Sequence, residues 1–519
     1  MPLPQLLLAH PQHWHQVEGD GLLACRGFIY ARTGELQTGA ELASHLAQEL
    51  SPDPHTLPQQ VARLNGCFAF YWQPANRPWS FAAVDKARSI PLFYNSAQVS
   101  DTVDITGGSL DPVQVDLFPY TGHSLGPNTL FQEWSQLQAG EVVLWTADAD
   151  PQCVSYFQPV SEERERPLSS LWSASLAVFE RLVESHQDQT FVVPLSGGYD
   201  SRLIASMLKH LNCEKVLCYT YGRKEGFEAK ISRQVAENLG YPWHFIPYDT
   251  ETLRSYLSEE GLKYQQFAGA GTCLAHEQDW MAVKEMKTKG LIPPNSVFLP
   301  GFGGDVMAGS WYPRVPLQQK EEVVDYLVSA EKFFSGKRVK DFDRANAAQL
   351  IAKELEPLDI SDMHSAFQAI QYWGWRNRMT KFLVNSVRVY EYWGYEWRLP
   401  FFDSEWIDTW LPLPDRHKPG KAAYLEMANR QLFEPLGVAF SQPSWKPDGW
   451  KQQVKRLLPA TWIDWFKGKT FDPDMLDTTN ARPLAELFCE EMGWPITKAQ
   501  TLSLNYIMAH FYLKFIQEG

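Results

Sequence analysis

The residues best suited to chemistry lie in one glycine-paired loop. The segment VVPLSGGYDSRLIASML (192–208) begins as an apolar run that ends at Leu195 and continues as a helical pattern. Gly197 and Gly198 let the backbone turn sharply and approach a ligand closely, because no Cβ obstructs the approach. The N–H groups of such a loop and the positive end of the following helix converge on one point. The sequence therefore predicts an oxyanion site in this loop.

Two serines and an aspartate complete the loop. Ser196 and Ser201 can add hydroxyl donors to a phosphate. Asp200 would repel a bare phosphate, so its presence predicts a Mg²⁺ ion between the carboxylate and the phosphate oxygens. A Walker loop is excluded, because GxxxxGK[ST] does not occur in the chain. The plainer alternative is a strand-to-helix turn that Asp200 merely caps, but the full string SGGYDS in this setting favours the phosphate site.

The pattern around the loop predicts a parallel sheet. Apolar runs suited to buried strands lie at 190–196, 215–222 and 243–249. Amphipathic helical patterns lie at 168–186, 202–211 and 228–240. Strands and helices that alternate at this spacing predict βαβ units and an α/β fold. The rest of the chain to Gly519 is expected to be largely helical.

The N-terminal part follows another pattern, in which short β segments are joined by turns. Strands are predicted at 22–31, 66–72, 79–85 and 141–147, and one helix is predicted at 40–50. This pattern predicts a layered α+β domain over residues 1–157. The charged, proline-bounded stretch QPVSEERERP (158–167) is typical of a linker, so the α/β domain is expected over 168–519.

Composition limits the possible functions. The chain has 519 residues, of which 44% are hydrophobic and 21% charged, as in a folded globular protein. Its net charge of −14 argues against a broad nucleic-acid groove or an anionic membrane surface as partner, although a local basic pocket could hold phosphate. No apolar run approaches the ~18–20 residues of a membrane span, and no signal peptide is recognised, so a cytoplasmic protein is expected. The seven cysteines are scattered without a CxxC pair, which indicates neither a disulfide framework nor a zinc site.

The loop string resembles a known motif. SGGYDS, in its strand–loop–helix setting, resembles the SGGxDS pyrophosphate loop of ATP pyrophosphatases and especially of the asparagine synthetase family. LPGFGGDVMAG (299–309) is similar to that family's second glycine loop, in which Asp305 would face Mg²⁺ and Gly303 and Gly304 would bind the cofactor. The resemblance implies that Asp200 and Asp305 together clamp Mg·pyrophosphate. The alternative is a glycine-rich turn with a capping Asp.

Further segments extend the resemblance over almost the whole second half of the chain. They lie at 219–246, 394–408 and 420–432, in the family's order. Within 394–408, Glu396, Arg398 and Asp403 are expected to be packing and ion-pair residues. Segments 64–72 and 82–94 resemble the family's glutaminase domain, which implies an Ntn-hydrolase-like layered fold for the N-terminal domain.

The N-terminal domain departs from the family at its nucleophile. Family glutaminases need Cys as the first residue after removal of Met, whereas here Met1 is followed by Pro2. Cys25 and Cys67 lie inside predicted strands, where a small buried hydrophobe is the expected role. We therefore expect that this domain releases no ammonia from glutamine and serves as a scaffold or binding surface.

The synthetase part departs at three places. Phe302 occupies the position of a Glu in asparagine synthetases and a Tyr in β-lactam synthetases, and phenylalanine cannot accept a proton. Glu391 is a candidate for a substitute base, but a solvated or ion-paired role is expected. Lys446 in SQPSWKPDGW is the candidate for the family's late lysine, which neutralises phosphate charge, with an ordinary surface lysine as the alternative. The segment 311–359 is longer than usual and could form a lid or a partner surface.

Together these features predict an AMP-forming ligase that uses ATP and Mg²⁺. A carboxylate would attack the α-phosphorus to give an acyl-adenylate, and an amine would then form the amide. The lost nucleophile and the apolar Phe302 favour an intramolecular amine, as in lasso-peptide cyclases, so the favoured substrate is a peptide that closes to a macrolactam. Alternatives are amidation of a small-molecule or sugar carboxylate by ammonia or an amine, and a non-catalytic ATP-binding pseudoenzyme. A partner protein that supplies or processes the substrate is left open.

Overall fold

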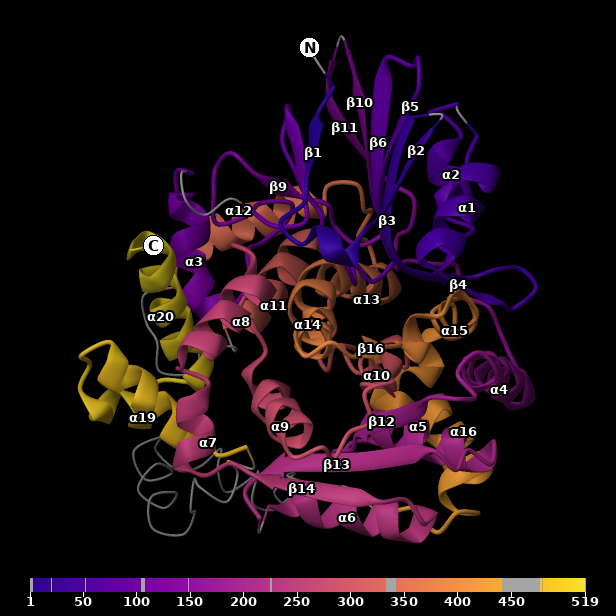
Figure 1. The fold of residues 1–519 in the computed structure, drawn as a ribbon, viewed down its shortest axis with the longest axis vertical. Helices are drawn as coiled ribbons and strands as arrows, with labels where there is room; N and C mark the ends of the chain where they lie inside the picture. Colours follow the sequence, from indigo (N-terminus) through magenta and orange to yellow (C-terminus); the bar gives the residue numbers. More distant parts are fainter. Residues whose placement is uncertain are drawn as a thin grey trace.

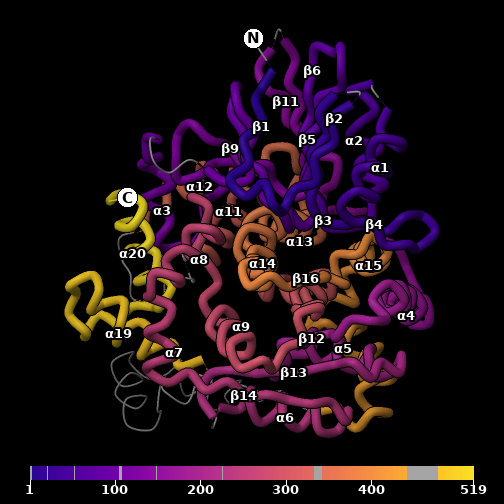
Figure 2. Tube along the Cα trace, viewed as in Figure 1, coloured from indigo at the N-terminus to yellow at the C-terminus, as the bar shows by residue number. Residues whose placement is uncertain are grey.

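The computed structural model describes residues 3–518, except 20, 52, 104–107, 148, 225, 333–341, 441–476 and 478. The strands of the described part form three sheets. Figure 1 shows the indigo and violet N-terminal strands at one end of the molecule and the magenta strands β13 and β14 at the other. Orange helices from the second half of the chain lie between the two ends, and the tube in Figure 2 shows the same order. This arrangement confirms the predicted fold class, a layered α+β part followed by a parallel-sheet α/β part.

The N-terminal part is built on a seven-stranded antiparallel sheet in the order β11-β10-β6-β5-β3-β2, with β4 paired to β3. The strands are β2 (His15–Gly19), β3 (Gly21–Tyr30), β4 (Leu36–Thr38), β5 (Asn65–Pro74), β6 (Trp79–Val84), β10 (Glu141–Thr146) and β11 (Ala149–Ser155). β3 and β5 pair over their full length, from Gly21 opposite Pro74 to Tyr30 opposite Asn65. These two long strands form the centre of the sheet.

Alternation along β5 explains why both faces of this sheet are covered. Phe68 and Phe70 point to the side packed by α1 (Gly39–Glu49) and α2 (Leu57–Val61). Ala69 and Tyr71 point to the opposite side, because successive side chains in a strand face opposite ways. That side adjoins a small sheet of β1 (Gln5–Leu7), β8 (Gln98–Ser100), β7 (Phe93–Tyr94) and β9 (Ser135–Gln136). The result is the predicted layered domain.

The second half contains a five-stranded parallel sheet in the order β14-β13-β12-β15-β16. The strands are β12 (Thr190–Pro194), β13 (Val216–Gly222), β14 (Trp243–Pro247), β15 (Ser296–Phe298) and β16 (Glu396–Trp397). The chain runs from β12 to β13 on one side, whereas β15 lies on the other side of β12. Ligands of open α/β sheets bind at such a reversal, outside the carboxyl ends of the strands.

Helices surround this sheet and make up most of the remaining described chain. Those between the strands are α5 (Tyr199–His210), α6 (Phe227–Leu239), α7 (Thr250–Ser255), α8 (Glu259–Gly269) and α9 (Glu277–Thr288), and α4 (Leu168–Glu184) precedes the sheet. After β15 follow α10 (Gly304–Met307), α11 (Lys320–Lys332), α12 (Arg344–Glu354), α13 (Met363–Gly374), α14 (Arg388–Tyr392), α15 (Ser404–Trp410), α16 (Ala422–Ala428), α19 (Ala481–Glu491) and α20 (Leu504–Glu518). Among the described residues, none of the helices has the length and hydropathy needed to cross a membrane.

The two parts of the chain are joined by buried charged contacts. Arg26 of β3 lies 2.6 Å from Glu391 of α14, with both side chains almost fully buried. Glu141 of β10 pairs with Arg376, which also binds Glu354 of α12 at 2.9 Å. An uncompensated charge in such surroundings would be strongly destabilising. The N-terminal part is therefore an integral part of the folded molecule.

The predicted linker contains no helix or strand, whereas the long segment contains α11 and α12. β11 ends at Ser155 and α4 begins at Leu168, and residues 156–167 form neither helix nor strand; the domain limits at 157 and 168 stay a prediction. In the segment 311–359, α11 and α12 bury an apolar face against α3 (Pro112–Thr121) of the N-terminal part and against α13. The described helices of this segment therefore contribute to the core between the two parts.

Candidate functional site

The first glycine loop is folded onto the start of α5. β12 ends at Pro194, and Gly198 is the residue before the first helical turn. The Ser196 N–H donates to Ser201 Oγ at 3.2 Å, and the Gly198 N–H donates to Ser196 Oγ at 3.1 Å. The two hydroxyl oxygens lie 3.1 Å apart. The two serines therefore hold the loop in a tight turn at the positive end of α5, where an anion is favoured.

The structure brings Asp200 and Asp305 together. The Asp305 N–H donates to Asp200 Oδ2 at 3.0 Å, and the Tyr424 hydroxyl donates to Asp200 Oδ1 at 2.7 Å. Asp200 comes from α5, after the central strand, and Asp305 comes from α10, after the adjacent strand β15. The two aspartates therefore meet at the point where the strand order reverses.

Three glycines permit this close approach. A Cβ on Gly301 would lie 2.8 Å from the Ser201 nitrogen, and one on Gly304 would lie 3.1 Å from the Asp200 carboxyl group. Gly303 has φ of +93°, and a Cβ there would lie 2.7 Å from the Phe402 ring. The second loop therefore needs these glycines for packing reasons, independently of any ligand. The glycines set the spacing at which the two carboxylates face one point.

The electrostatics of the pair suit a divalent cation. Burial and the nearby Asp305 carboxylate raise the pKa of Asp200 to about 7. Repulsion between the two carboxylates favours a cation between them. Carboxylate oxygens from separate turns, with room for substrate oxygens, are also the ligands that Mg²⁺ takes at phosphate sites. The donor set therefore fits the predicted Mg²⁺.

Lys421 is a site residue that the sequence did not single out. Its Nζ lies 3.2 Å from Asp305 Oδ2 and 5.5 Å from the centroid of the Tyr199 ring. It adopts φ of +61° directly before α16. The segment GKAAYLEMANRQL (420–432) resembles a family helix, but a lysine just before a helix does not indicate a contact with a loop 116 residues away. Its charge places a cation beside the carboxylate pair.

The predicted catalytic Lys446 lies outside the described residues, so its role stays a prediction. The described chain before it ends at Phe440, whose carbonyl accepts from Arg202 Nη1 at 2.7 Å. Arg202 also donates to the Gly197 carbonyl at 3.3 Å. Phe440 therefore lies beside the first glycine loop, six residues before Lys446 in the sequence.

Phe302 and Glu391, the two residues considered in connection with the missing base, lie in different surroundings. Phe302 is half-buried and packs against the core. Glu391 accepts from Arg26, Arg388 and Trp397. Burial raises the pKa of Glu391, but the two arginines outweigh burial and hold it below its usual range. Glu391 is thus an ion-paired residue, as expected, and is buried rather than solvated.

The family's ion-pair residues and the two strand cysteines also behave as expected. Arg398 lies 2.7 Å from Glu396, and Asp403 pairs with Arg181 at 2.9 Å. Cys25 and Cys67 are buried in β3 and β5. Burial raises the pKa of Cys25 to about 12, so its thiol stays protonated.

Comparison with known proteins identifies one family. The model of the asparagine synthase family matches residues 176–480, which is more than half of the chain. A search of curated proteins found no match. Among solved structures, the chain is similar to an NH3-dependent NAD synthetase from Campylobacter jejuni subsp. jejuni NCTC 11168 in complex with the nitrate ion. The identity is 17%, the alignment covers 33% of this chain and 77% of that chain, and the TM-score is 0.21.

Proposed function

Because the chain belongs to the asparagine synthase family, we propose that it is an AMP-forming ligase that activates a carboxylate as an acyl-adenylate. Family membership makes it an ATP-dependent amide-forming ligase with a carboxylate and an amine as substrates. The observation that carries the finer proposal is the meeting of Asp200 and Asp305 at the switch point of the sheet. A clamp at that point suits the two outer phosphates of ATP, and their departure as pyrophosphate leaves AMP on the acid.

Each residue of the site has a role in this chemistry. Asp200 and Asp305 would hold Mg²⁺, which neutralises charge on the leaving pyrophosphate. The loop from Ser196 to Ser201 and the positive end of α5 bind the phosphate oxygens. Lys421, and Lys446 as a further candidate, add positive charge where negative charge develops. The protein thus contributes placement and charge compensation, the main means of catalysing transfer at phosphorus.

For the acceptor we propose an amine on the substrate itself, so that the favoured product is a macrolactam of the lasso-peptide type. The expectation that the N-terminal domain releases no ammonia from glutamine supports this, because the amine must then come from another source. The half-buried Phe302, directly before Gly303, supports it too, because its apolar side chain suits an apolar peptide better than ammonia.

Two assays test the proposal. Pyrophosphate exchange into ATP should depend on a carboxylate substrate, and Asp200→Ala and Asp305→Ala should each abolish it. Asp249→Ala is the matched control, because Asp249 only caps α7, where it accepts from the Thr252 N–H at 2.9 Å. Release of ADP in place of AMP would contradict the adenylate, and absence of exchange with every acid tested would favour a non-catalytic ATP-binding protein.

The substrate class is tested with peptides. A peptide with a free N-terminus and an internal Asp or Glu should lose one water on incubation with ATP and Mg²⁺, as measured by mass spectrometry. The same peptide with an acetylated N-terminus should not react. Turnover of a small acid with added ammonia, without turnover of any peptide, would instead support the amidation route.

A further inference from the structure

Lys418 is a buried lysine whose partners are backbone carbonyls. It lies between α15 and α16, and only 1% of its surface is exposed. Its Nζ donates to the carbonyl oxygens of Met307 at 2.6 Å, Trp410 at 3.0 Å and Leu411 at 3.3 Å. Burial lowers the pKa of Lys418 to about 8, so the ammonium and its three donors persist near neutral pH. All three donors are used.

These bonds tie two segments together at the Asp305 turn. Met307 is the last residue of α10, two residues after Asp305. Close by, Gly309 has φ of +106°, and a Cβ on it would lie 2.5 Å from the Lys418 carbonyl oxygen. The turn that carries Asp305 therefore lies directly on Lys418.

The segment that follows Lys418 supplies contacts to both carboxylates. Lys421 Nζ lies 3.2 Å from Asp305 Oδ2, and the Tyr424 hydroxyl lies 2.7 Å from Asp200 Oδ1. Lys421 is three residues after Lys418 in the chain. The position of Lys418 relative to Met307 therefore fixes how far Lys421 stands from Asp305.

We propose that Lys418 is a positioning residue, which sets the distance between Lys421 and the Asp305 carboxylate and so the affinity of the site for Mg·ATP. It touches neither carboxylate and acts through Lys421. The proposal rests on the function proposed above only in requiring that the site binds a magnesium nucleotide.

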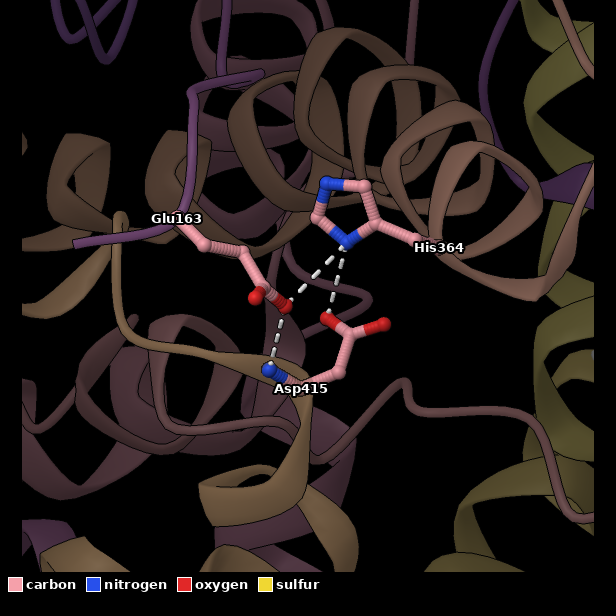
Figure 3. A group of neighbouring side chains, drawn as sticks. All are labelled: Glu163, His364 and Asp415. Atoms are coloured by element: carbon pink, nitrogen blue, oxygen red, sulfur yellow. Dashed lines mark hydrogen bonds and ion pairs between the residues drawn. The ribbon is translucent and has the colours of Figure 1, made fainter. Parts of the chain in front are cut away.

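The other side of this segment is held by the predicted linker. Figure 3 shows Glu163, His364 and Asp415 gathered around one point. The Asp415 N–H donates to Glu163 Oε1 at 2.8 Å, and His364 Nδ1 lies 3.5 Å from Glu163 Oε1 and 3.2 Å from Asp415 Oδ1. Nearby, the Arg164 N–H donates to the Pro412 carbonyl at 2.7 Å. The chain just before Lys418 is thus fixed to the linker.

These three side chains are called the clasp here, because they join the linker, α13 and the segment before Lys418. Gln368 Nε2 donates to the Ser161 carbonyl at 2.7 Å, which fixes the orientation of the amide. The same nitrogen lies 2.6 Å from His364 Nε2, which must then accept. Lys418 sits between this clasp and the Asp305 turn.

A double-mutant cycle tests the proposal. The probe is Mg²⁺ with α,β-methylene-ATP, whose binding to the full chain is measured by calorimetry for wild type, Lys418→Met, Lys421→Ala and the double variant. We expect Lys421→Ala to weaken binding about tenfold, the loss of one charge-assisted contact. Lys418→Met should weaken binding by a similar factor when Lys421 is present, and by less than about twofold when it is absent.

Lys381→Met is the matched control. Lys381 is also fully buried, and it donates to the Ser124 and Gly126 carbonyls and to Asn377 Oδ1, away from the Asp305 turn. The control should lose stability on thermal melting and keep the wild-type affinity for the probe. If Lys418→Met does not fold, Lys418→Arg, which keeps the charge and donors but changes their reach, takes its place in the cycle.

The outcomes separate the possible failures. Equal losses of affinity from Lys418→Met with and without Lys421 would overturn the proposal, because the residue would then act independently of Lys421. Unchanged affinity in folded Lys418→Met would also overturn it. Failure of the wild type to bind the probe would instead refute the proposed function, and the positioning role would fall with it.

Discussion

The raised pKa of Asp200 leads to a quantitative prediction about stability. In the folded chain without metal this carboxyl has a pKa of about 7, against 3.8 for its ordinary value. The folded state therefore binds more protons than the unfolded state between these two values. Stability should then fall as the pH rises from about 4 to about 7, and above pH 7 the full cost is present.

The size of this effect follows from the same two values. Ionising such a group costs the folded state up to about 4 kcal/mol. Asp200 is only half-buried by its solvent-exposed surface, so solvent screens part of the repulsion, and we expect about 2 kcal/mol. Asp200→Asn removes the titration while keeping the shape of the side chain. Part of this cost is already present at pH 5, so the stability of this variant relative to wild type should rise by about 1 kcal/mol between pH 5 and pH 8.

Urea denaturation with tryptophan fluorescence, in EDTA at four pH values from 5 to 8, measures this difference. Asp305→Asn should flatten the pH dependence of the wild type, because the Asp305 charge contributes to the raised pKa of Asp200. Asp249→Asn, at the exposed cap of α7, should leave it unchanged. A difference between Asp200→Asn and wild type that stays constant from pH 5 to pH 8 would refute the electrostatic account of the pair.

Three further predictions follow from the described contacts. Gly303→Ala should abolish pyrophosphate exchange and destabilise the chain by about 1–3 kcal/mol. The reason is that the added Cβ would lie 2.7 Å from the Phe402 ring, at a residue whose φ is +93°. Wild-type exchange by this variant would show that the loop can shift. Glu391→Gln should lower the free energy of unfolding by about 3–5 kcal/mol in urea denaturation, because the buried Arg26 and Arg388 would lose their counter-charge. An unchanged denaturation midpoint would mean that water reaches these groups. The purified protein should release no glutamate from glutamine in an enzymatic glutamate assay, and measurable glutamate would show that another nucleophile serves the N-terminal part.

The sequence predicted the local features well because they depend on nearby residues. Apolar runs such as 190–196 had to be buried on both faces, and they became parallel strands. The segment 66–72, predicted as a strand, lies within β5, which packs between two layers. The glycines of both loops marked sharp turns at strand ends, and the resemblance to the family suggested that Asp200 and Asp305 would meet.

Contacts between distant segments could not be predicted in the same way. Lys421 approaches Asp305 across 116 residues, and Glu391 finds Arg26 across 365 residues. Neither lysine nor glutamate carries a local pattern that names such a partner, because the pairing depends on how whole layers stack. The buried Lys418 is a similar case, since its neighbours His417, Pro419 and Gly420 predict an exposed turn.

The buried ion pairs between the two parts of the chain have a consequence for dissecting the protein. Removing residues 1–157 would leave the largely buried Glu391 and Arg376 without their partners Arg26 and Glu141. The apolar faces of α11 and α20 that rest on α3 would be exposed as well. The synthetase half expressed alone should therefore aggregate. The N-terminal part would thus act as half of a single cooperative structure, whatever its own activity.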